Sequence, residues 1–343
     1  MLRHPILIAG AGGSIGSALA RRLAALSPPN LVLLESSESS LYALQRDWSA
    51  SGLDCPATFV LGNVADRGLL EHIFAQHAPR LVFHAAAFKQ VPLMEEQPFA
   101  AIANNIFATE TLTKVAAAHH ARVLLLSTDK AVQPSSVMGA TKRVAEHIVL
   151  AARGTALRLC NVLASRDSVA EIFASQIAHG GPITVTDPAA RRYFLTLDEA
   201  VDLLLLAAAH SQPSSLLAPV LTSTHFIADL AHFMARELAP GREIAIQFTE
   251  PRPGDKEIEL LWAPGDSTHP AGPDASVRNA IVSIQSPVLS GPQLDASLVR
   301  LRNAVDARDL AVALASLQSL VPDYTPSNAV LAQTRKAGAP VSR

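Results

Sequence analysis

Ile6-Leu-Ile-Ala-Gly-Ala-Gly-Gly-Ser-Ile-Gly16 is the stretch that decides the fold of this chain. Its first four residues are apolar and predict a buried strand, and the glycines that follow allow a tight turn into a helix. Glycines at positions 10, 13 and 16 let the backbone approach a pyrophosphate, whose charge is favoured at the amino end of the helix. Because it lies between a strand and a helix, the string predicts a dinucleotide-binding loop.

Short apolar runs and helical segments alternate along the first half of the chain. Further apolar runs lie at 31–34, 57–61, 81–84 and 123–126, and segments with helical spacing separate them. Strands that alternate with helices in this way form right-handed crossover units and a parallel sheet. We therefore predict an α/β fold, a doubly wound parallel sheet, over residues 1–165.

The pattern is looser beyond residue 165. We assign residues 166–285 to a smaller α/β lobe for the substrate, from which some segments return to the first domain. Within it, residues 264–290 are rich in Pro, Gly and Ser, which predicts an exposed loop or linker. Helical periodicity returns at 298–320, so we assign residues 286–343 to a C-terminal helical segment and tail.

Composition excludes several classes of protein. The chain has 343 residues and a formal charge of −2, which gives no basic surface for nucleic acid. Cys55 and Cys160 are its only cysteines and the histidines are scattered, so we expect no disulfide framework and no metal site. The longest apolar block, at 203–209, is too short to span a membrane. We expect a soluble, cytoplasmic protein.

Glu35 ends the second apolar run, where a carboxylate can accept hydrogen bonds from the ribose hydroxyls of a dinucleotide. The same charge repels a 2′-phosphate, and no arginine follows it, so the sequence favours NAD over NADP. The alternative is an exposed glutamate in a turn. Asn63 and Val64 follow the third run, where a contact with the adenine is expected.

A second polar string, Ser127-Thr-Asp-Lys130, follows the apolar run that ends at Leu126. Ligands of open α/β sheets bind at the carboxyl ends of the strands, so these side chains are candidates for chemistry. Met138 and Lys142 follow on a predicted helix, at a spacing that places both on one face. The alternative is a polar turn in which Asp129 caps a helix.

At this point the chain resembles a known family, the polysaccharide-biosynthesis (CapD-like) branch of the extended short-chain dehydrogenases/reductases, of the UDP-N-acetylglucosamine 4,6-dehydratase type. The matching strings occur in family order across nearly the whole chain: Gly10–Gly16, His84–Glu95, Asn105–Thr109, Ser127–Pro134, Val137–Arg143, Gly181–Thr186, Arg192–Thr196, Arg252–Lys256 and Leu320–Tyr324. The resemblance implies a Rossmann domain and a homo-oligomer.

The resemblance also implies an activity. Such enzymes use NAD(P) to oxidise C4 of a UDP-sugar, eliminate water across C5 and C6, and return the hydride to C6. By resemblance, Lys130 is the base at C5, Asp129 is the acid at C6, Thr128 binds the C4 oxygen and Lys142 binds the nicotinamide ribose. The expected cofactor-binding residues are Gly10, Gly13, Ser14, Ile15, Gly16, Glu35, Asn63, Val64, Ala85, Ala86 and Lys142. The expected substrate-binding residues are Lys89, Asn161, Arg192 and Arg252.

Met138 stands where these enzymes usually have a tyrosine base, and a thioether cannot take a proton. The long, membrane-anchored members of the branch also carry methionine here and keep the C5 configuration, so we expect a C5-retaining reaction. Three acceptors remain open for the proton of the C4 hydroxyl. They are Thr128, a water relayed through Lys142, and Lys130 itself.

Several positions depart from the family pattern. Leu159 and Cys160 replace an aromatic residue and a glycine, and Asp167 replaces a glycine of an expected phosphate-binding loop. Two alternatives to a dehydratase therefore stay open. The first alternative is a 4-epimerase or reductase of the same family. The second is an NAD-binding scaffold without catalysis. Asp129 and Lys130 together favour the dehydratase, because C4 chemistry alone does not need this pair.

Overall fold

The computed structural model describes residues 3–272, 275–287, 289 and 291–337. Its centre is a nine-stranded sheet, of which seven strands run parallel. β1 lies between β2 and β4, so the chain reverses its winding direction beside the glycine-rich loop. From one edge to the other, the parallel strands are β3 (Ala57–Leu61), β2 (Leu31–Glu35), β1 (Ile6–Ala9), β4 (Leu81–His84), β5 (Arg122–Thr128), β6 (Thr155–Leu159) and β11 (Ser215–Pro219).

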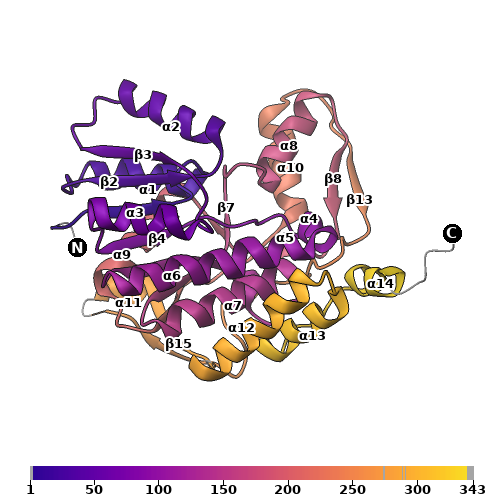
Figure 1. Ribbon diagram of the computed structural model, residues 1–343. Helices are drawn as coiled ribbons and strands as arrows, with labels where there is room; N and C mark the ends of the chain where they lie inside the picture. Colours follow the sequence, from indigo (N-terminus) through magenta and orange to yellow (C-terminus); the bar gives the residue numbers. More distant parts are fainter. Residues whose placement is uncertain (1–2, 273–274, 288, 290, 338–343) are drawn as a thin grey trace.

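Helices cover both faces of the sheet, which confirms the doubly wound α/β fold (Figure 1). The strands are apolar throughout because both of their faces are buried. One face packs against α1 (Ser14–Ala24), α2 (Glu38–Ala50), α9 (Leu197–His210) and α11 (Ala275–Ala280). The other packs against α3 (Arg67–His77), α6 (Ala108–Ala118) and α7 (Val137–Ala151). A π-helical turn (Ala103–Phe107) leads into α6.

The prediction of a loop over residues 264–290 is wrong. The segment holds β14 (Ser267–Pro270) and β15 (Ile281–Gln285), with α11 before β15. β15 pairs antiparallel with β11, and β14 pairs antiparallel with β15. The open edge of β11 would otherwise expose a row of unpaired backbone groups, so tertiary pairing overrides the turn-rich composition.

A small lobe stands beside the sheet, to the right in Figure 1. It comprises α8 (Val169–Ala178), β8 (Ile183–Thr186), α10 (Ile227–Leu238) and β13 (Ile246–Thr249). β8 and β13 pair in parallel, and Phe173, Ile177, Ile183 and Val185 lie in its core. Two short pairs connect it with the main domain: β7 (Asn161–Val162) with β10 (Phe194–Leu195), and β9 (Arg191–Arg192) with β12 (His225–Phe226).

Three C-terminal helices pack below α5 and α7 in Figure 1. They are α12 (Gly291–Asp306), α13 (Leu310–Leu320) and α14 (Asn328–Ala337), and they share a core with α4 (Val91–Glu96), α5 (Pro98–Ile102) and α7. The periodic segment 298–320 is two helices, because Arg308 takes a left-handed φ of 56° and Asp309 caps α13. Residues 338–343 of the predicted tail lie outside the described residues.

Among the described residues, no helix combines the length and apolar character that crossing a membrane requires.

Candidate active site

A cavity of about 590 Å³ lies between the carboxyl ends of the parallel strands and the small lobe. The glycine-rich loop and α1 line one part of it, and the string after β5 lines another. The small lobe contributes residues from α8, β8 and the loop before α8. The reversal of winding between β1 and β4 is where this class of sheet binds its ligands.

The glycine-rich loop fits a dinucleotide on steric grounds. Gly10 has a φ of 81°, and a Cβ on it would lie 2.6 Å from the backbone nitrogen of Ala86. A Cβ on Gly16 would lie 2.1 Å from the carbonyl oxygen of Gly10. In addition, α1 begins after Gly13 and has no side-chain cap in the described chain. The backbone N–H groups of its first turn are therefore free for an anion.

Glu35 lies directly under this loop. Its Oε2 accepts a hydrogen bond from the backbone nitrogen of Gly12 at 3.0 Å, and its Oε1 accepts one from Ser37 at 2.9 Å. The carboxylate is therefore fixed beside the loop, as expected of a ribose-binding group. Asn63 uses its Oδ1 to accept from the backbone of Ala65. The cavity is lined by Ser14, Ile15 and Ala85, whereas Glu35, Asn63, Val64 and Ala86 lie outside its lining.

The string after β5 holds a buried carboxylate. Asp129 is 0% exposed, and its Oδ1 accepts from the Thr128 hydroxyl at 2.9 Å and from Lys130 Nζ at 3.0 Å. Lys130 Nζ also donates to Oδ1 of Asn161 at 3.1 Å. The second oxygen of Asp129, Oδ2, is buried and has no hydrogen-bond partner among the described residues. A buried acceptor without a hydrogen bond lowers the stability of the protein, so its presence here indicates a functional role for Asp129.

Glu259 belongs to the same group, although the sequence analysis did not single it out. It is 2% exposed, and its two oxygens lie 3.8 Å from Lys130 Nζ and 2.9 Å from Lys256 Nζ. We call Asp129, Lys130, Lys256 and Glu259 the open cluster. Burial lowers the pKa of Lys130, but the carboxylates of Asp129 and Glu259 outweigh it and raise that pKa above its usual value. Lys130 is therefore an ammonium in the ligand-free protein.

Met138 and Lys142 both line the cavity, as their spacing on α7 predicts. Lys142 Nζ donates to the backbone oxygen of Leu126 at 2.6 Å. Burial lowers the pKa of Lys142 to about 8, and Glu146 partly opposes this effect. The amine is thus held against the backbone of β5 and, like Thr128, lines the cavity. Met138 is 3% exposed and packs in the core shared with the C-terminal helices.

A second group of charges lies behind the strand ends. Glu146 is 0% exposed and accepts from Arg158 Nε and Nη2, each at 2.9 Å, and from Arg143 Nη1 at 2.8 Å. Ser127 donates its hydroxyl to Glu146 at 2.6 Å. We call Ser127, Arg143, Glu146 and Arg158 the closed cluster. Burial raises the pKa of Glu146, but the two arginines outweigh it and lower that pKa to about 2.

The four predicted substrate residues differ in position. Lys89, Asn161 and Arg252 line the cavity. Arg192 does not, and its guanidinium donates to the backbone oxygens of Arg191, Lys256 and Glu257 at 2.7 to 2.8 Å. It therefore fixes the loop that carries Lys256 and lies near Lys130, whose charge it opposes.

All three of the family departures, Leu159, Cys160 and Asp167, line the cavity. Cys160 lines it, and burial raises the pKa of this thiol to about 12, so it stays protonated. Asp167 also lines it and has a φ of 56°, a conformation that favours glycine. The backbone of Asp167 donates to Glu171 at 2.7 Å, which holds this turn at the start of α8.

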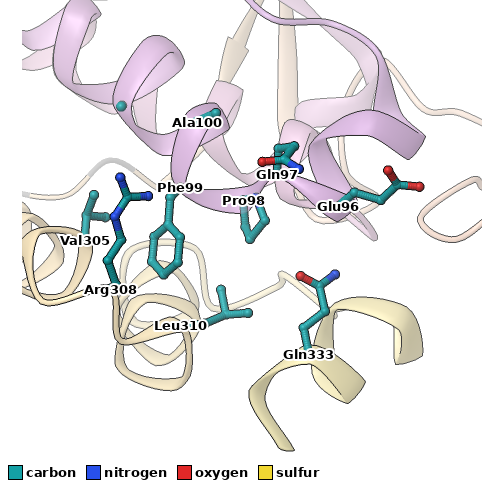
Figure 2. A pocket seen from close by; sticks show the side chains of 10 residues that line it. Glu96, Gln97, Pro98, Phe99, Ala100, Val305, Arg308, Leu310 and Gln333 are labelled. Carbon is teal, nitrogen blue, oxygen red and sulfur yellow. The ribbon is translucent and has the colours of Figure 1, made fainter. Parts of the chain in front are cut away.

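A second cavity, of about 360 Å³, lies away from this site, between α5 and the C-terminal helices (Figure 2). The guanidinium of Arg308 lies 5.3 Å from the ring centroid of Phe99 at its wall. None of the predicted site residues lines this second cavity. Its lining residues are Glu96, Gln97, Pro98, Phe99, Ala100, Ala103, Val305, Arg308, Leu310 and Gln333.

Residues 6–279 match the family model described as polysaccharide biosynthesis protein. The capsular polysaccharide biosynthesis protein CapD of Staphylococcus aureus is 39% identical over 75% of this chain, and the match covers 44% of that protein. The chain thus spans less than half the length of this relative. A UDP-glucose 4-epimerase of Rickettsia canadensis is 32% identical over 76% of this chain and 78% of that enzyme.

Solved structures share the fold. Pen from Bacillus thuringiensis superposes with a TM-score of 0.76 and 26% identity, over 84% of this chain and 90% of Pen. DesIV, a dTDP-glucose 4,6-dehydratase from Streptomyces venezuelae solved with NAD and TYD bound, gives a TM-score of 0.65 and 20% identity over 75% and 87% of the two chains. Because its sequence is matched over most of its length, the chain is a member of the polysaccharide biosynthesis protein family, and it shares its fold with nucleotide-sugar epimerases and dehydratases of known structure.

Proposed function

We propose that this protein catalyses the NAD-dependent 4,6-dehydration of a UDP-N-acetylhexosamine, of which UDP-N-acetylglucosamine is the first candidate. The product is the 4-keto-6-deoxy sugar nucleotide with its C5 configuration retained, for the synthesis of a surface polysaccharide. The observation that carries the proposal is the buried Asp129 between Thr128 and Lys130, in a cavity that also contains the glycine-rich loop. An acid and a base side by side suit the removal of water from neighbouring carbons.

The cofactor fits the residues of the glycine-rich loop. Bound NAD would supply the hydride acceptor for C4 and return the same hydride to C6. Gly10, Gly13, Ser14, Ile15 and Gly16 would hold its pyrophosphate at the uncapped end of α1. The carboxylate of Glu35, fixed under the loop, supports NAD over NADP because it repels a 2′-phosphate.

The hydrogen bond from Thr128 to Asp129 supplies a route for the C4 proton that Met138 cannot take. Thr128 Oγ1 accepts the proton of the C4 hydroxyl while its own proton passes to Asp129 Oδ1, 2.9 Å away. Lys142, held beside this point, favours the transfer by its positive charge and positions the nicotinamide ribose. Asp129 thereby becomes the neutral acid that the next step requires.

Dehydration then uses both members of the pair. Protonated Asp129 donates its proton to the departing C6 hydroxyl, which leaves as water, while Lys130 removes the proton from C5. Lys130 would return this proton to the same face of C5 when the hydride returns to C6. Lys130 acts as a base only when neutral, so the proton that it carries in the ligand-free protein must first leave through the cavity. Neutralisation of Asp129 helps, since it removes one of the two carboxylates that raise the pKa of Lys130.

Incubation of the purified protein with UDP-N-acetylglucosamine and NAD tests the proposal. Mass spectrometry should show a product lighter by one water, and NMR of that product should show the retained C5 configuration. The Asp129→Asn variant should lose about 10³-fold of this activity, because the acid is gone. It should still bind NAD, since Asp129 lies outside the glycine-rich loop. Tight NAD binding without any change in a panel of UDP-hexosamines would contradict the proposal.

The second candidate is C4 epimerisation of a UDP-sugar. The similarity to the UDP-glucose 4-epimerase of Rickettsia canadensis over most of both chains favours it. An epimerase product has the mass of its substrate and differs only at C4, so the same mass and NMR measurements separate the two candidates. Retention of activity in Asp129→Asn would also favour the epimerase.

A further inference from the structure

One loop of the substrate side lies on the cofactor side of the cavity. Residues 163–168 connect β7 with α8, and Leu163, Ser165, Arg166, Asp167 and Ser168 all line the cavity. Ser168 caps α8, so the loop is continuous with the small lobe. The loop therefore links the small lobe directly to the cofactor side of the cavity.

Arg166 joins this loop to three elements of the dinucleotide domain. Its Nη2 donates to the backbone oxygen of Gly12 at 2.6 Å, and its Nη1 donates to the hydroxyl of Ser40 at 3.0 Å. Its backbone nitrogen donates to the hydroxyl of Ser14 at 2.9 Å. Its backbone oxygen accepts from Lys89 Nζ at 2.5 Å. The side chain of Arg166 is thus bound to the glycine-rich loop and to α2, and its backbone is bound to the start of α1.

The guanidinium lies at the end of the loop where Glu35 is fixed. A Cβ on Gly12 would lie 2.7 Å from Cβ of Ser40 and 3.0 Å from Cγ of Glu35, so these three residues are packed together. This is the part of the loop to which the proposed function assigns the ribose of the cofactor. A dinucleotide carries two phosphate charges and ribose hydroxyls, and an arginine fork suits both.

We propose that Arg166 is a cofactor-retaining residue, which closes the 163–168 loop over the bound dinucleotide from the substrate side. This inference rests on the proposed function. The proposed reaction takes a hydride from the sugar and returns it to the same sugar, so reduced cofactor must not leave in between. Because Arg166 and the cap of α8 belong to one loop, sugar nucleotide in the cavity also strengthens the retention of the cofactor.

The rate at which NADH dissociates measures the retention of the cofactor directly, without turnover. The protein is loaded with NADH, an excess of NAD is added, and the loss of NADH fluorescence gives the dissociation rate. Arg166→Ala should release NADH at least about tenfold faster than the wild type, because a charge-assisted contact is lost. Arg166→Lys should lie between them, since it keeps the charge without the fork. Arg46→Ala removes an exposed arginine of α2 that pairs with Asp47, and should release NADH at the wild-type rate.

A second arm adds UDP-N-acetylglucosamine before the chase. It should slow the release of NADH from the wild type and from Arg46→Ala, and it should have no effect on Arg166→Ala. Release from Arg166→Ala at the wild-type rate would overturn the role of Arg166, while NADH binding and dehydration by the wild type would leave the proposed function standing. Failure of the wild type to bind NADH at all would overturn both.

Discussion

The open cluster and the closed cluster both hold a buried carboxylate beside cations, but they differ in whether every carboxylate oxygen has a hydrogen-bond partner. In the closed cluster, both oxygens of Glu146 accept hydrogen bonds, from two arginines and from the hydroxyl of Ser127. All four residues are buried. In the open cluster, Asp129 keeps one buried oxygen without a partner, and Lys130 lines the cavity. The two lie on either side of the end of β5, because Ser127 belongs to one and Thr128 is bonded to the other.

The difference teaches which of two adjacent polar side chains is available for chemistry. A carboxylate whose acceptors are all satisfied stays ionised and fixes the backbone around it, whereas one with a spare acceptor can take a proton. Ser127 is therefore a structural residue and Thr128 a candidate for the reaction. Arg158 also donates to the backbone oxygen of Leu261, and it thereby fixes the segment that carries Glu259.

The largest effect should follow from breaking the closed cluster. Glu146→Gln leaves Arg143 and Arg158 as buried cations without a counter-charge, and it should lower the free energy of unfolding by about 3–5 kcal/mol. Urea unfolding followed by circular dichroism measures this. Glu71→Gln, which removes an exposed carboxylate that pairs with Arg67, is the matched control and should change stability by less than about 1 kcal/mol. A small effect of Glu146→Gln would show that the arginines find water or other partners, and that the cluster is not closed.

A smaller effect should follow in the open cluster from Glu259→Gln. One of the two carboxylates that raise the pKa of Lys130 is then gone, so this pKa should fall. The rise of kcat with pH, which reports the neutral lysine in the proposed mechanism, should move to lower pH by the same amount. The pH profile of dehydration, measured from pH 6 to 11, checks it, and at any pH below the midpoint Glu259→Gln should have the higher kcat.

The profile also separates an electrostatic role from a structural one. If Glu259 only positions the loop that carries Lys256, the variant lowers kcat at every pH and leaves the midpoint unchanged. Asp255→Asn serves as the control, because this carboxylate pairs with Arg252 on the same loop and lies outside the open cluster. Its midpoint should equal that of the wild type.

The sequence predicts the parts of this structure that depend on local pattern. The run Ile6–Ala9 and the glycines after it identify the parallel sheet and its loop, and parallel strands bring their carboxyl ends together. Thr128, Lys130 and Lys142 therefore line one cavity, as expected. Helical spacing also places Met138 beside Lys142.

What depends on long-range pairing was not predicted. The composition predicts a loop where β14 and β15 lie, because these strands are stabilised by pairing along the edge of β11, which is remote in sequence. Glu259 reaches Lys130 only through the fold of the segment after β13. Its position three residues after Lys256, which ends a matched string, is a signal that could have identified it. Arg192 was expected near the substrate, yet its donors go to backbone oxygens, and no sequence pattern gives the direction of a side chain.

The last effect concerns Lys142, whose Nζ donates to the backbone oxygen of Leu126 in β5. Its pKa in the folded protein is about 8, below the 10.5 of an unperturbed lysine, because burial disfavours the ammonium. The unfolded chain therefore binds more protons than the folded one between these values, and the free energy of unfolding should rise with pH in this window. Below pH 8 both states carry the proton, and the cost of burying the ammonium is present in full. Lys142→Met should remove this rise, so the difference in stability between wild type and variant, measured by urea unfolding at pH 7.5 and pH 9.5, should shift in favour of the wild type at the higher pH. An unchanged difference would mean that water in the cavity solvates the amine of Lys142, and that its pKa in the folded protein is not lowered.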